Sequence, residues 1–270
     1  MSTCRSLLRG GLAEIRQQVK SARSLSVFLD FDGTLVPLVE DPDEARLGVP
    51  MRDLLKVLAS RAGVLTAIVS GRALSDLQTR VGVAGIVYAG NHGLEISGKG
   101  LRFMEPFSAD RQGLLRQISE CLTESLSNIP GVRVEYKGLT ASVHHRQAPA
   151  EARPDIERIV TTVVAPGVSP FHLNQGKMVL EIVPRAAWNK GAAVCWINSR
   201  LAGPGALSVY VGDDQTDETA FRQLSEGITV CVGRPEVTSA RFCVPDPDGV
   251  RRFLSWLIEN RQRRTADGAI

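Results

Sequence analysis

Two acidic residues, Asp30 and Asp32, stand at the end of an apolar stretch in the segment LDFDGTL (29–35). Side chains two residues apart in an extended chain point the same way, so both carboxylates can face one ligand. Carboxylates in such a pair can hold a cation, exchange a proton or act as a nucleophile. Gly33 permits a sharp turn with close approach of the backbone, and Thr34 adds a hydroxyl. A strand that ends in a polar turn, with Asp32 as a cap, would show the same two acids.

A second acidic segment, GDDQTDE (212–218), contains four carboxylates in close succession. Crowded carboxylates repel one another unless a cation holds them, and hard oxygen ligands suit Mg²⁺. The start of a helix also favours Asp and Glu, because the helix dipole is positive there. Both interpretations can hold together. Asp213 and Asp214 would then bind the metal, and Asp217 and Glu218 would begin the helix.

Two shorter segments offer groups that suit an anion. VSGR places Ser70 and Gly71 after an apolar run, where a hydroxyl and a backbone N–H can bind phosphate at the start of the next helix. NKG (189–191) opens a helical segment with Lys190, a point charge that suits phosphate. Taken alone, Ser70 could be a helix cap and Lys190 a solvated lysine of a first turn.

These residues need a scaffold, and short apolar runs that alternate with helical patterns provide one. The runs cover 25–31, 64–70, 85–91, 207–213 and 227–233. Their alternation with helices predicts an α/β fold, a doubly wound, Rossmann-like core around a parallel sheet that is buried on both faces. Ligands bind beyond the carboxyl ends of such strands, and four of the five runs end there in polar residues.

The middle of the chain, 101–183, has a different pattern. It predicts a helix (109–127), a strand pair (132–146), a second helix (151–163) and a second strand pair (168–184), with short glycine-containing turns in the pairs. This αββαββ order predicts an inserted α+β cap domain that acts as a lid. The core domain would then comprise 25–100 and 184–264.

The two ends of the chain are expected to be helical. Apolar residues recur at helical intervals in the first 24 residues, at Leu8, Leu12, Ile15 and Val19. They predict an amphipathic leader helix in 1–24 and no export signal. Near the other end, Asp248 is expected to cap a closing helix that reaches about 264, and 265–270 would form a frayed tail.

Composition excludes several classes of protein. The 270 residues carry a formal charge of only +3, and arginines are scattered, which speaks against a nucleic-acid-binding surface. Five cysteines, never in a CxxC pair, speak against a disulfide framework and a zinc site and favour the cytoplasm. No apolar stretch approaches the roughly 18 residues that a membrane-spanning helix needs.

Taken together and in this order, DFDGT, VSGR, NKG and GDDQTDE resemble the four motifs of the haloacid dehalogenase superfamily of phosphatases. The insert between the second and third motifs resembles the large C2-type cap of that superfamily. DPDEA, GNHGLE, VEYKG followed by HHR, and VLEIVP are similar to elements of the trehalose-6-phosphate phosphatase family. The likeness covers about residues 25–258.

This resemblance implies a phosphoric monoester hydrolase of trehalose biosynthesis, which converts trehalose 6-phosphate to trehalose and phosphate. Asp30 would form an aspartyl-phosphate, and Asp32 would protonate the leaving sugar oxygen and then activate water. The implied cofactor is Mg²⁺, with the ligands Asp30, the backbone carbonyl of Asp32, Asp213 and the nearby Asp214. The implied phosphate-binding residues are Ser70, Gly71 and Lys190.

The resemblance also implies residues that recognise the sugar. The family positions fall on Glu135, Lys137 and Glu181, with Arg146, His145, Asn91, His92 and Glu95 as further candidates. From spacing alone, Glu135 and Lys137 would be an ordinary pair on one strand face, and the histidines could be structural. Where family members usually have a tyrosine, this chain has His145, which leaves the fine substrate preference open. Lys177, just before a strand, is interpreted as a turn residue.

Other functions fit the same motifs. The substrate could be another sugar phosphate, of the sucrose, mannosylglycerate or validoxylamine type, and a phosphomutase would use the same aspartyl-phosphate. A non-catalytic sugar-phosphate sensor would be expected to have lost the nucleophile, the acid/base or the metal acids, all of which are present here. We expect a monomer that acts on a small-molecule sugar phosphate, in functional pairing with a trehalose-6-phosphate synthase and without nucleic acid or membrane.

Overall fold

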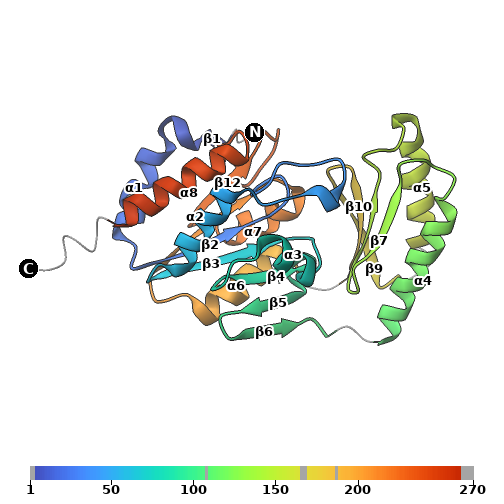
Figure 1. Cartoon of the computed structure of the whole chain (residues 1–270), viewed down its shortest axis with the longest axis horizontal. Coiled ribbons are helices and arrows are strands. Elements are labelled where there is room, and N and C mark those ends of the chain that lie inside the picture. The colour runs from blue at the N-terminus through green and yellow to red at the C-terminus, as the bar shows by residue number, and fades with distance from the viewer. Residues whose placement is uncertain (1–3, 107–108, 165–168, 186–187, 263–270) are drawn as a thin grey trace, which may run out of the picture. The chain divides into compact units, whose positions relative to one another are not determined.

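The computed structural model describes residues 4–106, 109–164, 169–185 and 188–262, so the expected tail lies outside the described residues. The chain forms two compact units (Figure 1). We call Met1–Phe103 with Trp188–Ile270 the core unit, and Met104–Ala187 the cap unit. Residues 101–103, which the sequence placed in the cap, belong to the core unit because they extend its sheet.

The core unit is built on a nine-stranded sheet in the order β1-β13-β12-β11-β2-β3-β4-β5-β6. Its strands are β1 (Arg5–Ser6), β2 (Ser24–Leu29), β3 (Val64–Val69), β4 (Val87–Gly90), β5 (Glu95–Gly98), β6 (Leu101–Met104), β11 (Ala206–Gly212), β12 (Ile228–Val232) and β13 (Phe242–Val244). In this sheet order, every pair of neighbouring strands between the edge strand β1 and β4 runs parallel. The next strand, β5, runs antiparallel to β4. The five predicted strands are present, and the predicted α/β class is confirmed.

Helices cover both faces of this sheet. One face carries α1 (Leu12–Ser21), α2 (Val49–Ser60), α3 (Leu74–Val81) and α8 (Pro247–Gln262), and the other carries α6 (Lys190–Leu201) and α7 (Glu218–Gln223). A strand between two such layers is apolar on both sides, and every residue of β3 is buried. This double burial explains why the strands read as continuous apolar runs.

The leader is only partly helical. β1 pairs with β13 at the edge of the sheet, a turn at Leu7–Gly11 follows, and only then does α1 begin. Ile15 and Val19 are buried as the spacing predicts, whereas Leu8 and Leu12 lie at the margin of the core. The edge strand was not predicted because a two-residue strand carries no periodicity.

The residue that caps the N-terminus of the closing helix, α8, is not the expected one. Asp246, rather than Asp248, accepts a hydrogen bond from the backbone N–H of Gly249, at 2.8 Å. Pro247 occupies the first position of α8, so the capping residue precedes it. Asp248 lies inside the first turn and pairs with Arg251.

The cap unit contains a four-stranded antiparallel sheet in the order β7-β8-β10-β9. Its elements are α4 (Ala109–Ser125), β7 (Arg133–Tyr136), β8 (Ala141–His144), α5 (Arg153–Val164), β9 (Phe171–Gly176) and β10 (Val179–Pro184). Both helices pack on one face of the sheet, against Val143 and Ile182 among others. The observed order is the predicted αββαββ.

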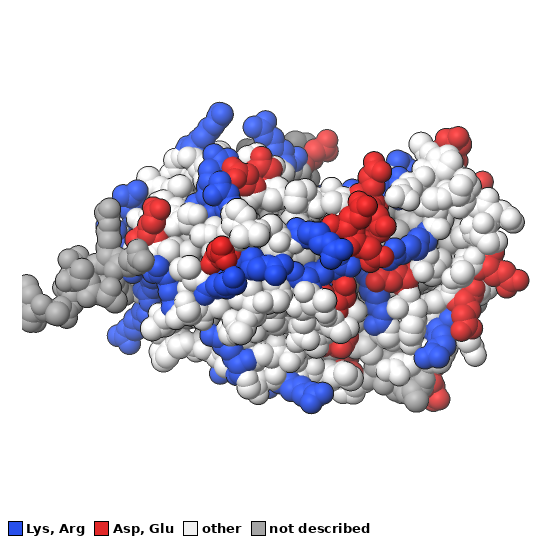
Figure 2. Space-filling model, in the orientation of Figure 1, with Lys and Arg blue, Asp and Glu red and all other residues white. Residues whose placement is uncertain are grey.

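Acidic and basic side chains are interspersed on the face of the described residues that Figure 2 shows. None of the helices in the described ranges has the length and hydropathy that crossing a bilayer requires.

Candidate active site

The site lies where the strand order of the core sheet reverses, between β2 and β11. From β2 the chain continues to β3 and β4 on one side, whereas β11, β12 and β13 fill the other side. Crevices at such a switch point bind ligands in open α/β sheets. The backbone N–H of Asp30, just after β2, donates to the carbonyl of Val211 in β11 at 2.9 Å. The two acidic motifs are therefore neighbours in space.

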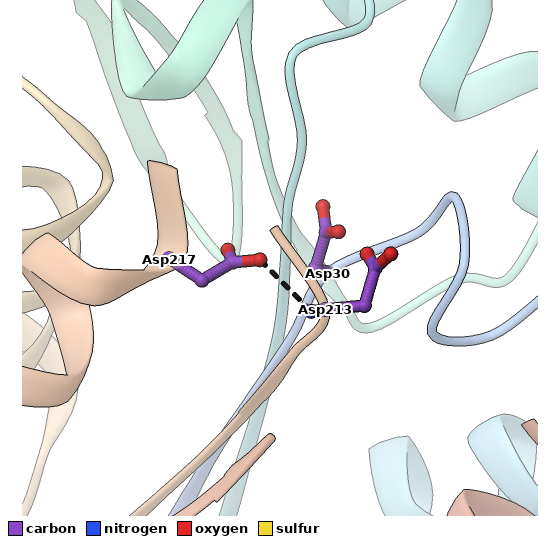
Figure 3. Close-up of side chains that lie close together, drawn as sticks. All are labelled: Asp30, Asp213 and Asp217. Atoms are coloured by element: carbon purple, nitrogen blue, oxygen red, sulfur yellow. Dashed lines mark hydrogen bonds between the residues drawn. The ribbon is translucent and has the colours of Figure 1, made fainter. Parts of the chain in front are cut away.

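Three carboxylates gather at this edge (Figure 3). One oxygen from each of Asp30, Asp213 and Asp217 lies within 4.8 Å of the others. Asp30 is 4% exposed and Asp217 is fully buried. Carboxylates that are buried away from water repel one another more strongly than exposed ones. This cluster therefore requires positive charge nearby.

Lys190 provides part of that charge. Its Nζ donates to Asp30 Oδ1 at 3.0 Å and to Asp217 Oδ1 at 2.8 Å. Burial by itself would lower the pKa of Lys190, but the charges of Asp217 and Asp30 raise it well above its usual value. Asn189 caps α6 by accepting from the Ala192 N–H at 3.0 Å, so the lysine is held at the first position of the helix.

Asp217 organises the acidic loop. Its Oδ1 accepts from the Tyr210 hydroxyl at 2.6 Å as well as from Lys190. Its Oδ2 accepts the backbone N–H groups of Asp213 and Asp214, each at 3.0 Å. We interpreted Asp217 from the sequence only as a residue that begins a helix. Its spacing of one helical turn from Asp213 was the signal for a position in the cluster.

The charge of the cluster fits a divalent cation. When ionised, the three carboxylates and the one ammonium of Lys190 leave two formal negative charges. Burial, and to a smaller degree the charges of Asp217 and Asp213, raise the pKa of Asp30 well above its usual value, against the lowering effect of Lys190. Hard oxygen donors with uncompensated charge are suitable ligands for such a cation.

The backbone leaves room at this cluster. Gly33 has φ +73°, and a Cβ there would overlap the Asp213 carboxylate. The Thr34 hydroxyl lies 3.5 Å from Asp213 Oδ1, at the outer limit of a hydrogen bond. Any other residue at position 33 would therefore displace Asp213, which gives the glycine of DFDGT a steric reason.

The two other predicted metal ligands have different side-chain partners. Asp214 accepts from the backbone N–H of Gln215 at 2.7 Å and forms a capping box with Asp217 at the start of the turn 215–217. Burial raises the pKa of Asp214. The side chain of Asp32 faces Arg72. A role for Asp214 at the metal and for the Asp32 carbonyl stays a prediction.

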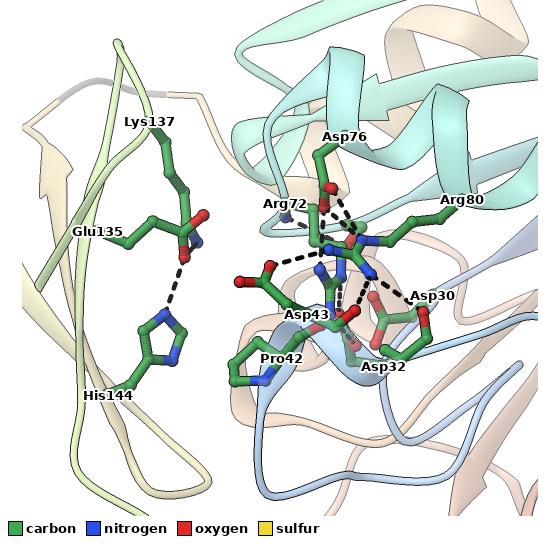
Figure 4. A network of polar contacts seen from close by, with 12 residues as sticks. Asp30, Asp32, Pro42, Asp43, Arg72, Asp76, Arg80, Glu135, Lys137 and His144 are labelled. Atoms are coloured by element: carbon green, nitrogen blue, oxygen red, sulfur yellow. Dashed lines mark hydrogen bonds and ion pairs between the residues drawn. The ribbon is translucent and has the colours of Figure 1, made fainter. Parts of the chain in front are cut away.

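Arg72 holds the Asp32 carboxylate by both oxygens (Figure 4). Its Nε donates to Oδ2 at 2.7 Å, and its Nη2 donates to Oδ1 at 2.8 Å. Bidentate pairs of this kind fix orientation as well as charge. The role of Arg72 in VSGR was not predicted from the sequence. Asp76, four residues later in α3, was a signal that this arginine has an acidic partner.

A network holds Arg72 itself. Its Nη1 donates to Asp76 at 2.9 Å, and its Nη2 also donates to the carbonyl of Pro42 at 2.8 Å. Arg80 binds the same Asp76 and, at 3.1 Å, Asp43 in DPDEA. Burial raises the pKa of Asp76, but hydrogen bonds from the two arginines lower it overall. The network connects the loop after β2 to α3.

Ser70 and the segment after β4 lie at the same edge of the sheet. Ser70 follows β3, is 1% exposed, and accepts from the Arg72 N–H at 3.2 Å through its Oγ. Its carbonyl accepts from the His92 N–H at 2.9 Å. Asn91 donates to Glu95 at 2.5 Å, and Asn91 and His92 both have positive φ. Such strained residues cluster at functional sites, and their roles toward phosphate or sugar stay predictions.

The cap unit has a polar group of its own. His144 Nε2 and Glu135 Oε2 are hydrogen-bonded at 2.8 Å, and Lys137 lies 4.0 Å from the same oxygen (Figure 4). Glu181 is 7% exposed on the neighbouring β10. His144 was not among the predicted sugar-binding residues, although it precedes His145 in the HHR segment.

The other residues of the cap unit that the sequence analysis considered lie outside this polar group. Arg146 donates to the carbonyl of Lys177 at 3.1 Å, and Lys177 is exposed in the turn between β9 and β10. His145 is 6% exposed, and burial, with the charge of Arg153, lowers its pKa. The turn position of Lys177 is the one that the sequence indicated.

The pair of Glu135 and His144 has a measurable consequence at acid pH. Burial would raise the pKa of Glu135, but the hydrogen bond to His144 and the charge of Lys137 lower it to about 2, from a usual value of 4.5. A lowered carboxyl pKa stabilises the folded state above the unfolded value, and this stabilisation is lost as pH falls through the folded value. We therefore expect Glu135→Gln to lower the free energy of unfolding at pH 7, with the difference from wild type shrinking between pH 4.5 and 2. Denaturant titrations at several pH values measure it.

The matched control for that experiment is Glu151→Gln, because Glu151 is an exposed acid of the same unit. A constant difference between wild type and Glu135→Gln across this pH range would contradict the pairing.

The sequence and the fold of this chain are similar to those of named phosphatases. Residues 28–247 match the trehalose-phosphatase family. Trehalose-phosphate phosphatase B of Arabidopsis thaliana is 34% identical over 261 residues, which cover 91% of this chain and 69% of that protein. The crystal structure of a trehalose-6-phosphate phosphatase related protein has a TM-score of 0.73 at 27% identity, covering 88% of this chain and 99% of the other. A haloacid dehalogenase-like hydrolase from Bacteroides thetaiotaomicron, at 14% identity and TM-score 0.62, covers 86% of this chain and 99% of its own and shows the fold alone.

The doubly wound sheet with its inserted α+β unit is the fold that this chain shares with the haloacid dehalogenase-like hydrolase, and the acids lie at its switch point. The predicted resemblance to a narrower group is also confirmed. The chain belongs to the trehalose-phosphatase family and is a phosphatase.

Proposed function

We propose that this enzyme hydrolyses trehalose 6-phosphate to trehalose and phosphate through an aspartyl-phosphate on Asp30. The observation that carries the proposal is the buried cluster in which Asp30 accepts from Lys190 beside Asp213 and Asp217. The family and its Arabidopsis relative are named after trehalose phosphate, and the protein of the similar crystal structure is named after trehalose 6-phosphate.

In the first step an oxygen of Asp30 attacks phosphorus, and the bond from phosphorus to the sugar oxygen breaks. Asp32 gives its proton to the departing sugar oxygen. Lys190 and Ser70 bind the phosphoryl oxygens, on which negative charge is spread during transfer. Lys190 contacts Asp30 directly, so its ammonium lies at the reacting carboxylate.

In the second step water attacks the phosphorus of the aspartyl-phosphate. Asp32, now ionised, accepts the proton of that water, and phosphate leaves as Asp30 is regenerated. Arg72 is a positioning residue in the second step, in which it orients the ionised Asp32 carboxylate by two hydrogen bonds. The Asp32 side chain is 34% exposed, so it can still reach substrate and water.

We propose Mg²⁺ as the cofactor, held by Asp30, Asp213 and the Asp32 carbonyl, with Asp214 close by. When bound, it supplies positive charge that offsets the repulsion between the phosphate and the carboxylates. Asp217 fits a supporting role, since its two oxygens already accept four hydrogen bonds from Lys190, Tyr210 and the loop backbone.

The test is phosphate release from a panel of sugar phosphates in the presence of Mg²⁺. We expect trehalose 6-phosphate to give the highest kcat/KM, ahead of sucrose 6-phosphate, mannosylglycerate phosphate, a validoxylamine-type phosphate and glucose 6-phosphate. A different leading substrate would correct the sugar and keep the chemistry. Transfer of the phosphoryl group to sugar would indicate a mutase. No phosphate release from any member of the panel would favour a non-catalytic sugar-phosphate sensor.

Three further proposals concern the setting of the enzyme. We propose that it is a monomer, that it acts in the cytoplasm, and that it consumes the product of a trehalose-6-phosphate synthase. Light scattering of the purified protein and fractionation of cells test the first two.

A further inference from the structure

One row of residues crosses all four strands of the cap sheet. Glu135 on β7 is the register partner of Ser142 on β8, Ser142 is the partner of Glu181 on β10, and Glu181 is the partner of Asn174 on β9. Directly opposite residues in antiparallel strands project from the same face. Glu135, Ser142, Glu181 and Asn174 therefore form one polar row, which we call the cap row.

The cap row lies on the face of the sheet away from the helices. The alternate residues of β8 and β10, Val143 and Leu180 among them, pack against α4 and α5 in the cap core. Since successive side chains point to opposite faces, the row residues point away from those helices. Four polar positions in register are not needed to build this core.

Ser142 is the member of the row that most clearly indicates a ligand. Its side chain is 1% exposed, yet its Oγ makes no hydrogen bond within the described part of the chain. A buried hydroxyl without a partner destabilises a protein. It lies between the two glutamates in the register, where an arriving hydroxyl group would satisfy it.

The Glu135 carboxylate is held through one of its two oxygens. Both His144 and Lys137 lie close to its Oε2, and Oε1 accepts no hydrogen bond from another described residue. His144 lies on the row's own face, two residues from Ser142. The contacts hold one oxygen of the carboxylate and present the other to a donor.

The chemistry of the row matches a neutral polyol. Carboxylates only accept hydrogen bonds, whereas the hydroxyl of Ser142 and the amide of Asn174 can both donate and accept. Sugar hydroxyls need both kinds of partner. Glu135 and Glu181 lie on strands separated by β8, roughly 10 Å between backbones, which is too far for one shared cation. Among the described residues, the acids that could hold a metal ion together are Asp30, Asp213 and Asp217.

We propose that Ser142 and Asn174 are specificity-determining residues that bind sugar hydroxyls together with Glu135 and Glu181. This inference rests on the proposed function and deepens it, because it extends sugar recognition from two carboxylates to a four-residue row. It also provides the row with the donors that carboxylates lack.

The experiment compares Ser142→Ala and Asn174→Ala with the matched control Gln175→Ala. Gln175 is an exposed amide next to Asn174 that projects from the opposite face. Each variant is assayed with Mg²⁺ on trehalose 6-phosphate and on p-nitrophenyl phosphate, which has no sugar hydroxyls. We expect each row variant to lose about 2- to 10-fold in kcat/KM on the sugar phosphate, mainly through KM, as for one neutral hydrogen bond. Rates on p-nitrophenyl phosphate should stay unchanged in all variants.

Thermal unfolding separates recognition from structure. Removal of a buried hydroxyl without a partner should leave the Tm of Ser142→Ala equal to or above that of wild type, while its sugar-phosphate activity falls. Row variants that behave like Gln175→Ala on trehalose 6-phosphate, or that lose equally on both substrates, would overturn the inference.

Failure of the proposed function gives a different result. Wild type would then release no phosphate from trehalose 6-phosphate, and the row variants would be compared on the preferred sugar phosphate of the panel. If the panel gave no rate, calorimetric binding of trehalose to wild type and the three variants would decide. Equal binding by all of them would overturn the role of the row.

Discussion

Asp30→Asn is expected to abolish phosphate release from trehalose 6-phosphate, with a loss of at least about 1,000-fold, as for removal of a nucleophile. An amide oxygen cannot form the aspartyl-phosphate, although it can still accept the hydrogen bond from Lys190. Initial rates of phosphate release, measured at saturating Mg²⁺, give the result.

The same variant should remain folded and, without added divalent cation, be at least as stable as wild type. Burial raises the pKa of Asp30, with the charges of Asp217 and Asp213 adding to it, so at neutral pH the ionised side chain destabilises the folded state. Asparagine removes that charge. Asp53→Asn, at an exposed position of α2, is the control for loss of an acid elsewhere in the core unit. Wild-type activity in Asp30→Asn would show that another residue is the nucleophile.

Asp32→Asn is expected to lower turnover of trehalose 6-phosphate by about 10²- to 10⁴-fold, the usual contribution of general acid–base catalysis. Folding should be preserved, as should metal binding through the backbone carbonyl. p-Nitrophenol leaves without a proton, so with p-nitrophenyl phosphate the first step should be spared and the second impaired. Rapid mixing should then show a burst of nitrophenol equal to the enzyme concentration, followed by a slow steady state.

The control for Asp32→Asn must account for Arg72, which loses a charged partner in that variant. Asp76→Asn removes the other carboxylate that Arg72 binds and leaves Asp32 in place. We expect Asp76→Asn to retain most of its activity and to show no burst. An equal loss in the two variants would assign the effect to the orientation of Arg72 and would contradict proton transfer by Asp32.

Local patterns in the sequence predicted much of the scaffold. β3 is apolar at every position because both faces of its sheet are covered, and α6 begins where Asn189 supplies a cap. Such signals depend on neighbours within a few residues. For the same reason the ends of β2 and β11 could be recognised, and with them the acids that follow.

Partners distant along the chain could not be predicted. Lys190 and Asp30 are 160 residues apart, and Arg72 and Asp32 are 40 apart, so neither contact leaves a local pattern. The short strands β1 and β13 form because the sheet beside them offers unpaired backbone groups. Their own two or three residues carry no sufficient signal.

The sequence by itself determined the α/β class, the αββαββ insert, and the acids and lysine at the strand and helix ends, because periodicity and end signals are local. Only the tertiary structure decided that Asp217 completes the acid cluster, that Arg72 orients Asp32, and that Ser142 and Asn174 align with two glutamates. Each of these depends on which strands are neighbours and on their register, and these are set by packing of the whole chain.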